Sequence, residues 1–120
     1  MDDEPFILSA LVRFFQHSLP GTPLWTASTA AEGLAHLGQG RVGVIVSDYR
    51  MPDMDGIAFL ERCRRLQPGA RRLLFTAYAD PQVEEEARTR AGITAFVPKG
   101  GDPLQLLDAV RAAMPAETAA

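Results

Sequence analysis

An aspartate that follows an apolar run has the residue type and the placement to do chemistry. The run from Val42 to Val46 predicts a strand buried on both faces, as in a parallel sheet, and Asp48 comes two residues after it. Ligands of open α/β sheets bind beyond the carboxyl ends of such strands. Asp48 is therefore a candidate nucleophile or metal ligand, with the capping of a turn as the structural alternative.

Four other polar residues are expected to converge on Asp48. Asp2 and Asp3 come shortly before a predicted helix start, and Thr76 and Lys99 each end an apolar run that reads as a strand. Together these groups fit phosphoryl transfer, in which carboxylates hold Mg²⁺, Asp48 attacks, and a hydroxyl and an ammonium stabilise the phosphoryl oxygens. Taken singly, each group also has an ordinary structural role, such as capping a helix or carrying a solvated charge.

The combination of these residues with one loop resembles a known family. The loop reads Asp48-Tyr-Arg-Met-Pro-Asp-Met-Asp-Gly56, and it is joined by the acidic pair before Glu-Pro, by Thr76-Ala and by Lys99. In order and approximate spacing, these motifs resemble the receiver domains of bacterial two-component response regulators. The resemblance runs from Asp2 to about Met114, nearly the whole chain.

The resemblance implies a phosphoryl acceptor with a metal beside it. Asp48 would accept the phosphoryl group from a sensor histidine kinase or a phosphotransfer protein, with Mg²⁺ as the cofactor. The metal site would be formed by Asp2, Asp3, Asp48 and Arg50. Arg50 and Tyr78 would also flank the path of the water that hydrolyses the acyl phosphate, and both are bulky.

The resemblance also implies a switch. Thr76 and Lys99 would act with Asp48 in catalysis, and Thr76 with Phe96 would carry the signal to the face of the fourth helix, the last strand and the last helix. The family usually has proline after its lysine, whereas here Pro98 precedes Lys99 and two glycines follow. We expect a looser loop around Lys99 for that reason.

Strand and helix patterns alternate along the chain, which predicts a doubly wound parallel sheet of the α/β class. The receiver resemblance makes this flavodoxin-like, with the strand order 2-1-3-4-5. Helices are expected at residues 5–18, 30–37, 57–66, 81–90 and 103–114, and strands at residues 24–26, 42–47, 72–76 and 94–97.

The first strand of the family is missing from this pattern. The family has a short apolar strand before its acidic pair, and this sequence begins at Met1. That strand is interior, so its absence leaves a slot about 10 Å wide between neighbours, twice the ~4.8 Å strand spacing. Three outcomes are open: the strands close up, a second chain fills the slot, or the natural protein has residues that this sequence lacks. We expect poorly anchored Asp2 and Asp3, weak Mg²⁺ binding, and a homo-oligomer that exchanges elements between chains.

Composition fits one small domain. The chain has 120 residues, 47% of them hydrophobic, which predicts a receiver domain over residues 1–115 and an Ala-rich tail or linker start over residues 116–120. A net charge of −3 gives no basic surface for binding nucleic acid, and no apolar run approaches the length of a membrane span. A single cysteine, Cys63, fits a buried side chain in a cytoplasmic protein.

Two rival motifs start at Asp53. Asp53-Met-Asp-Gly resembles the nucleophile loop of haloacid-dehalogenase-like phosphatases, but Pro52 precedes it and the strand has already ended. A calcium loop fails because its twelfth position is Arg64. We therefore expect a phosphorylation-operated binding module and not an enzyme acting on a diffusing metabolite. The alternative is a pseudo-receiver that cannot be phosphorylated and serves as an interaction or dimerisation module.

Overall fold

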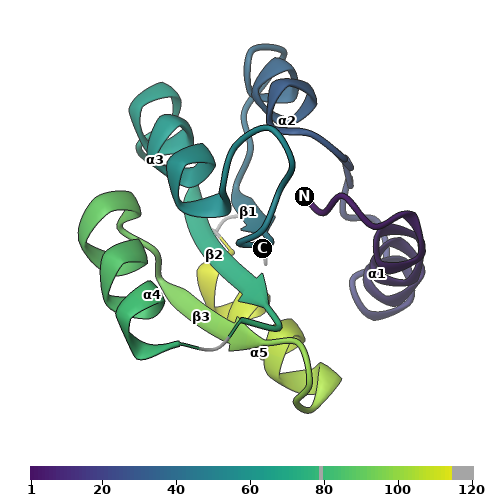
Figure 1. Ribbon diagram of the computed structural model, residues 1–120. Coiled ribbons are helices and arrows are strands. Elements are labelled where there is room, and N and C mark those ends of the chain that lie inside the picture. Colours follow the sequence, from purple (N-terminus) through teal and green to yellow (C-terminus); the bar gives the residue numbers. More distant parts are fainter. Residues whose placement is uncertain (79, 115–120) are drawn as a thin grey trace.

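Helices cover both faces of a small sheet in this chain (Figure 1). The computed structural model describes residues 1–78 and 80–114. In chain order the elements are α1 (Pro5–Ser18), α2 (Ala30–Leu37), β1 (Val44–Ser47), α3 (Gly56–Leu66), β2 (Arg71–Thr76), α4 (Pro81–Glu86), the π-helical turn η1 (Ala87–Ala91), β3 (Ala95–Pro98) and α5 (Pro103–Ala113).

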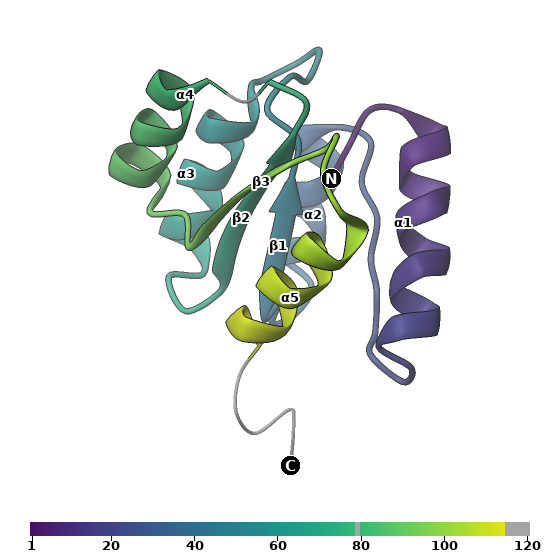
Figure 2. The ribbon, with the colours of Figure 1, turned by 90° about the horizontal axis from the view of Figure 1, so that it is seen from below.

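The sheet has three parallel strands in the order β1-β2-β3. Val44 lies opposite Arg71 in the first pair, and Leu73 lies opposite Ala95 in the second. Helices connect the strands and lie on both faces, with α2, α3 and α4 on one side and α1 and α5 on the other (Figure 2). This confirms the doubly wound, flavodoxin-like class, and all three strands end at the same edge of the sheet.

The two faces of the sheet bury separate apolar clusters. Side chains alternate along β2, so Leu74 joins the cluster under α2, α3 and α4 while Leu73 joins the cluster under α1 and α5. Cys63 is fully buried in the first cluster, and burial raises the pKa of its thiol to about 12. This side chain is therefore a packing residue, as its spacing in the sequence predicted.

Polar residues begin the helices where the sequence places them. Four helices start at a side chain that accepts a backbone N–H of the first turn: Thr29, Asp55, Asp80 and Asp102. Proline occupies the first turn of α1, α4 and α5, where its missing N–H costs nothing. Such caps contribute ~1 kcal/mol each and fix the direction in which each loop leaves its strand.

Two expected elements differ from the structure. The helix expected over residues 81–90 is α4 followed by the π-helical turn η1, which ends at Gly92 in the left-handed conformation. Residues 24–26 do not form a strand but an irregular extended segment. The physical reason is that a strand needs a neighbour to complete its hydrogen-bond ladder, and the sheet of the described residues contains β1, β2 and β3 but not this segment.

Met1 and Asp2 lie beside the end of β1 and are held there by backbone hydrogen bonds. The Met1 amino group donates to the Val46 carbonyl, and the Met1 carbonyl accepts from the Asp48 N–H at 2.9 Å. On the other side, the Asp2 N–H donates to the Ala27 carbonyl at 3.1 Å. The expectation of a poorly anchored acidic pair is therefore wrong for Asp2, because the backbone on both sides holds it.

Candidate functional site

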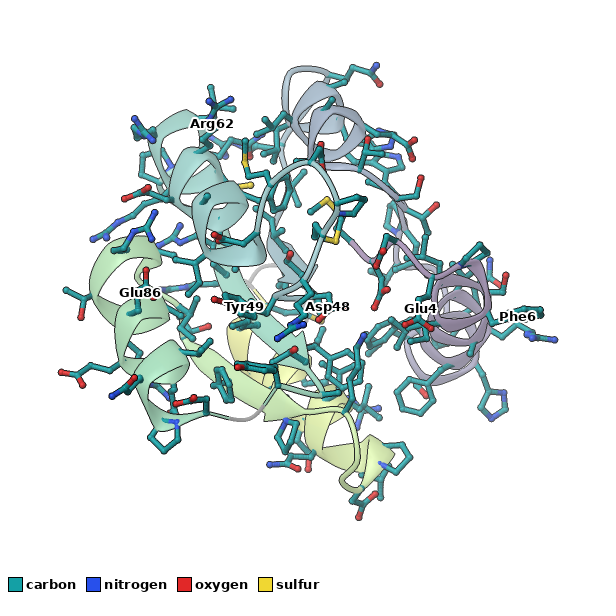
Figure 3. All side chains as sticks on the ribbon, viewed as in Figure 1. Glu4, Phe6, Asp48, Tyr49, Arg62 and Glu86 are labelled. Carbon is teal, nitrogen blue, oxygen red and sulfur yellow. The ribbon has the colours of Figure 1, made fainter. Side chains whose placement is uncertain are left out.

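Asp2 and Asp48 form the centre of the site. Asp2 is only 2% exposed and Asp48 only 9%, and each carboxylate accepts one backbone N–H nearby. The Asp2 Oδ1 accepts from Glu4 at 3.0 Å, and the Asp48 Oδ1 accepts from Tyr49 at 2.7 Å. Figure 3 shows Asp48 and Tyr49 together near the carboxyl end of the sheet, with Glu4 between them and α1. Two carboxylates are thus brought out of water at the end of β1.

Lys99 bridges these two carboxylates. Its Nζ donates to the Asp2 Oδ2 at 2.6 Å and to the Asp48 Oδ2 at 3.0 Å. Burial alone would lower the pKa of Lys99, but its hydrogen bonds to Asp2 and Asp48 outweigh burial and raise the pKa. The lysine is therefore charged over the whole neutral range and offsets part of the negative charge.

The backbone of Lys99 is also fixed. Its N–H donates to the Thr76 carbonyl at 2.9 Å, which ties the residue to the end of β2. Gly100 and Gly101 follow it, and the sequence predicted a looser loop on their account. The bond to Thr76 lies before the glycines, so it holds the lysine in place whatever freedom they allow.

Asp3 completes a group of carboxylates that fits a hard cation. Single oxygens of Asp2, Asp3 and Asp48 all lie within 4.8 Å of one another. Carboxylate oxygens are what Mg²⁺ prefers, and Mg²⁺ usually keeps several waters besides one or two protein carboxylates. Asp3 is exposed, unlike the other two, which leaves one side of the group open to water and to an incoming phosphoryl group.

Arg50 can join this group only through its backbone. A guanidinium has no acceptor, so a metal ligand at this position has to be the main-chain carbonyl. The side chain instead lies 4.5 Å from the centre of the Tyr78 ring. Tyr78 in turn stacks on Tyr49 at 5.7 Å. The family resemblance predicted Arg50 and Tyr78 as bulky neighbours of Asp48. Nothing in the sequence predicted that Tyr49 would stack on Tyr78.

Thr76 and Phe96 lie on the same face of the sheet. Phe96 is opposite Leu74, and alternation places Thr76 on that side as well. Thr76 is 2% exposed, and its hydroxyl oxygen accepts the Tyr78 N–H at 3.1 Å. The hydroxyl proton is therefore available for another acceptor. Phe96 is half-buried and packs against the cluster under α3 and α4.

The rival motif at Asp53 has a structural role here. The Asp53 carboxylate accepts the Ala30 N–H at 3.2 Å, at the start of α2. Asp55 accepts the Ala58 N–H at 2.8 Å and caps α3. Both acids hold helix starts, and neither belongs to the carboxylate group around Asp48.

Gly56 sets the path of the loop that carries Asp48. A Cβ on Gly56 would lie 1.9 Å from the Asp48 carbonyl oxygen and 3.0 Å from the Tyr49 Cα. The Gly56 N–H donates to the Tyr49 carbonyl at 2.6 Å, so the loop closes tightly on itself. Only glycine permits this approach, which links the last residue of the loop motif to the position of the candidate nucleophile.

Comparisons with known proteins bear on the family and the fold of this chain. The family described as the response regulator receiver domain matches residues 1–111. The transcriptional regulatory protein GlrR of Escherichia coli is 31% identical over 92% of this chain, which covers 24% of that protein. A CheY-like receiver domain protein from Methanospirillum hungatei has a crystal structure with a TM-score of 0.83 and 29% identity, covering 92% of this chain and 86% of that one.

A third structure shares the fold. TrrA from Thermotoga maritima, solved in complex with Mg²⁺-BeF, has a TM-score of 0.82 at 24% identity, covering 94% of each chain. Several curated relatives are much longer than the matched part, and the chain spans about half the length of one and a quarter of another.

The loop geometry predicts that Gly56→Ala lowers stability. Helix propensity favours alanine by ~1 kcal/mol at such a position, whereas the clash with the Asp48 carbonyl should cost about 1–3 kcal/mol. We expect the clash to win, because backbone atoms cannot move aside as a flexible side chain does. Urea denaturation measures the difference. Gly69→Ala is the matched control, since no atom lies within 4 Å of its added Cβ, and it should stay within about 0.5 kcal/mol of the parent. Equal stability of the two variants would refute the account of the loop.

Proposed function

Since the chain belongs to the family of response regulator receiver domains, we propose that Asp48 accepts a phosphoryl group in a two-component phosphorelay, with Mg²⁺ as cofactor. The donor would be a sensor histidine kinase or a phosphotransfer protein. One observation carries the proposal: Asp2, Asp3 and Asp48 place carboxylate oxygens within 4.8 Å of one another, with the Lys99 Nζ 3.0 Å from Asp48. This is a nucleophile with a cation site and a fixed positive charge beside it.

The residues of the site divide the work of transfer. An Asp48 carboxylate oxygen attacks phosphorus, the bond from phosphorus to the imidazole nitrogen of the donor breaks, and the imidazole leaves with the electron pair. Lys99 is placed to shift its hydrogen bonds from the carboxylates to the phosphoryl oxygens as negative charge arrives. Mg²⁺, when bound, would neutralise charge at those oxygens. Asp2 and Asp3 would hold it with Asp48 and the Arg50 carbonyl.

The signal would pass from the site to the surface through Thr76 and Phe96. The free Thr76 hydroxyl proton can be donated to a phosphoryl oxygen, which draws the threonine toward Asp48. Phe96, on the same face, could then turn into the space that the threonine leaves. Both residues are in strands that adjoin α4 and α5, so the readout would be a changed surface formed by α4, β3 and α5.

We infer a domain over residues 1–115 that signals by binding and is not itself an enzyme for a metabolite; residues 115–120 lie outside the described part. None of the helices in the described residues has the length and apolarity that crossing a bilayer requires. We propose a cytoplasmic location, with no nucleic acid contact by this domain.

A second candidate function is favoured by the exposure of Asp3. A pseudo-receiver would keep the site residues but fail to bind Mg²⁺, and would act as an interaction or dimerisation module. A calorimetric titration with Mg²⁺ separates the two functions, because only the phosphoacceptor needs the ion.

The first prediction from this proposal concerns Asp48. Acetyl phosphate with Mg²⁺ should add one phosphoryl group to the chain, and Asp48→Asn should abolish the addition because an amide is not a nucleophile here. Intact-protein mass spectrometry measures it. The control is Asp102→Asn, which keeps the cap of α5 because asparagine caps as well as aspartate. Labelling of Asp48→Asn at the parental level would overturn the assignment.

The second prediction concerns the lifetime of the acyl phosphate. The Arg50 guanidinium, two residues along the chain from Asp48, lies 4.5 Å from the centre of the Tyr78 ring, and we infer that the two side chains form a cover over the approach to Asp48. In-line attack needs an unobstructed water. The double variant Arg50→Asn, Tyr78→Ala should hydrolyse its acyl phosphate about three- to tenfold faster. A tenfold change corresponds to ~1.4 kcal/mol in the activation barrier of hydrolysis. Tyr78→Phe keeps the ring and is the matched control. The decay of phosphorylated protein is followed by mass spectrometry, and equal half-lives for all three proteins would contradict the role of the cover.

The third prediction concerns association. We propose that the chain forms a homo-oligomer, by packing of apolar faces or by exchange of elements, because α1 exposes Phe6 and its inner face lines an open cavity. Light scattering should give a mass well above the 13.0 kDa of one chain. Phe6→Lys places a charge on the outer side of α1 and is expected to weaken the oligomer. A stable monomer at high concentration would show that the fold tolerates the cavity alone.

A further inference from the structure

We propose that Asp53 is a positioning residue for phosphoryl transfer. Its carboxylate ties the loop that carries Asp48 to the start of α2, and so holds the main-chain carbonyl of Arg50 in place for the cation. This inference deepens the proposed function and rests on it. Three observations carry it: the bond from Asp53 to α2, the small number of bonds in the same half of the loop, and a cap that α2 has of its own.

The Asp53 carboxylate lies at the start of α2, although the two are distant in the chain. Its Oδ2 accepts the Ala30 N–H at 3.2 Å, and its Oδ1 lies 3.5 Å from the same nitrogen. The loop between β1 and α3 passes beside α2 (Figure 1). The first N–H groups of a helix have no partner within the helix, and the helix dipole attracts a negative charge to that end. The start of α2 is therefore a favourable anchor for an acidic loop residue.

The two ends of the loop are held by other bonds. At the start, the Tyr49 N–H donates to the Asp48 carboxylate at 2.7 Å. At the end, the Gly56 N–H donates to the Tyr49 carbonyl at 2.6 Å, and Asp55 caps α3. These bonds fix the ends of the loop but do not reach the residues between them.

The middle of the loop depends on Asp53. Among the described residues, the backbone of residues 50–52 makes no hydrogen bond to the rest of the chain. Met54 packs against the apolar cluster under α2, α3 and α4, which holds the second half of the loop. The bond from Asp53 to α2 is thus the polar anchor nearest to the Arg50 carbonyl on that side.

The helix α2 has a cap without this carboxylate. The Thr29 hydroxyl oxygen accepts the Glu32 N–H at 3.1 Å, and the Thr29 carbonyl accepts the Gly33 N–H at 3.1 Å. Asp53 satisfies a different group, the Ala30 N–H. Because the helix start is already formed by its own residues, the bond restricts the loop more than it stabilises the helix.

Loss of this bond should appear first in the affinity for the ion. Asp53→Ala should weaken Mg²⁺ binding about tenfold, the lower end of the effect of residues that support a metal ligand from behind. Calorimetric titration measures this change. The rate of labelling by acetyl phosphate should fall at low Mg²⁺ and return to within about twofold of the parent at saturating Mg²⁺, because the nucleophile itself is unchanged.

A second measurement needs neither the ion nor phosphorylation. Arg50 is exposed, and trypsin cleaves after it when the loop opens. Asp53→Ala should speed this cleavage about fivefold, since proteolysis follows the population of the open state. Cleavage after Arg41, which follows α2 and is also exposed, should keep its parental rate because α2 keeps its own cap.

Two further variants separate the position of the carboxylate from its charge and from the helix. Asp53→Asn keeps a side-chain oxygen that accepts an N–H, and it should stay near the parent in both measurements. Thr29→Ala removes the cap of the same helix. It should lower the urea midpoint of unfolding at least as much as Asp53→Ala and speed cleavage after Arg41, while Mg²⁺ affinity and cleavage after Arg50 stay parental. Asp53 is exposed, so its variants are expected to fold.

Three results would overturn the proposal. Parental cleavage after Arg50 in Asp53→Ala would show that the carboxylate does not hold the loop. Equal effects of Asp53→Asn and Asp53→Ala would assign the change to charge, and equal effects of Thr29→Ala would assign it to α2. A parent protein that binds no Mg²⁺ would instead refute the proposed function, and cleavage after Arg50 would still decide whether Asp53 holds the loop.

Discussion

The ion bridge from Lys99 to Asp2 and Asp48 is the interaction on which the site depends. Taking two carboxylates and an ammonium out of water costs several kcal/mol per ion, and only close pairing with further hydrogen bonds offsets it. Each carboxylate here accepts a backbone N–H as well as the lysine. The three residues come from the start of the chain, the end of β1 and the end of β3. The bridge therefore holds three distant segments in one place.

The convergence of these residues could be predicted because parallel strands end at one edge of the sheet. Asp48, Thr76 and Lys99 each follow an apolar run, and that pattern alone places them together. The helix starts were equally readable, since Pro5, Pro81 and Pro103 stand in the first turns of α1, α4 and α5. At these positions the local structure and the overall fold favour the same residue types, so the sequence pattern predicts the structure reliably.

The features that the sequence did not predict depend on contacts with segments that are distant in the chain. Residues 24–26 have the composition of a strand but no complete ladder beside them, so composition did not decide their structure. Met1 anchors Asp2 through backbone groups, which any residue type could supply, so its role left no mark in the sequence. The stack of Tyr49 on Tyr78 joins loops that follow different strands, and their spacing along the chain gives no sign of contact.

Met1 connects the end of β1 to the carboxylate group. Its carbonyl accepts the Asp48 N–H, and the next residue is Asp2, whose carboxylate pairs with Lys99. The Asp2 N–H donates in turn to the Ala27 carbonyl, so the backbone of Asp2 is held on both sides before any ion binds. Ligands that are fixed beforehand lose less conformational freedom on binding, so these backbone bonds should raise the affinity of the carboxylate group for a cation.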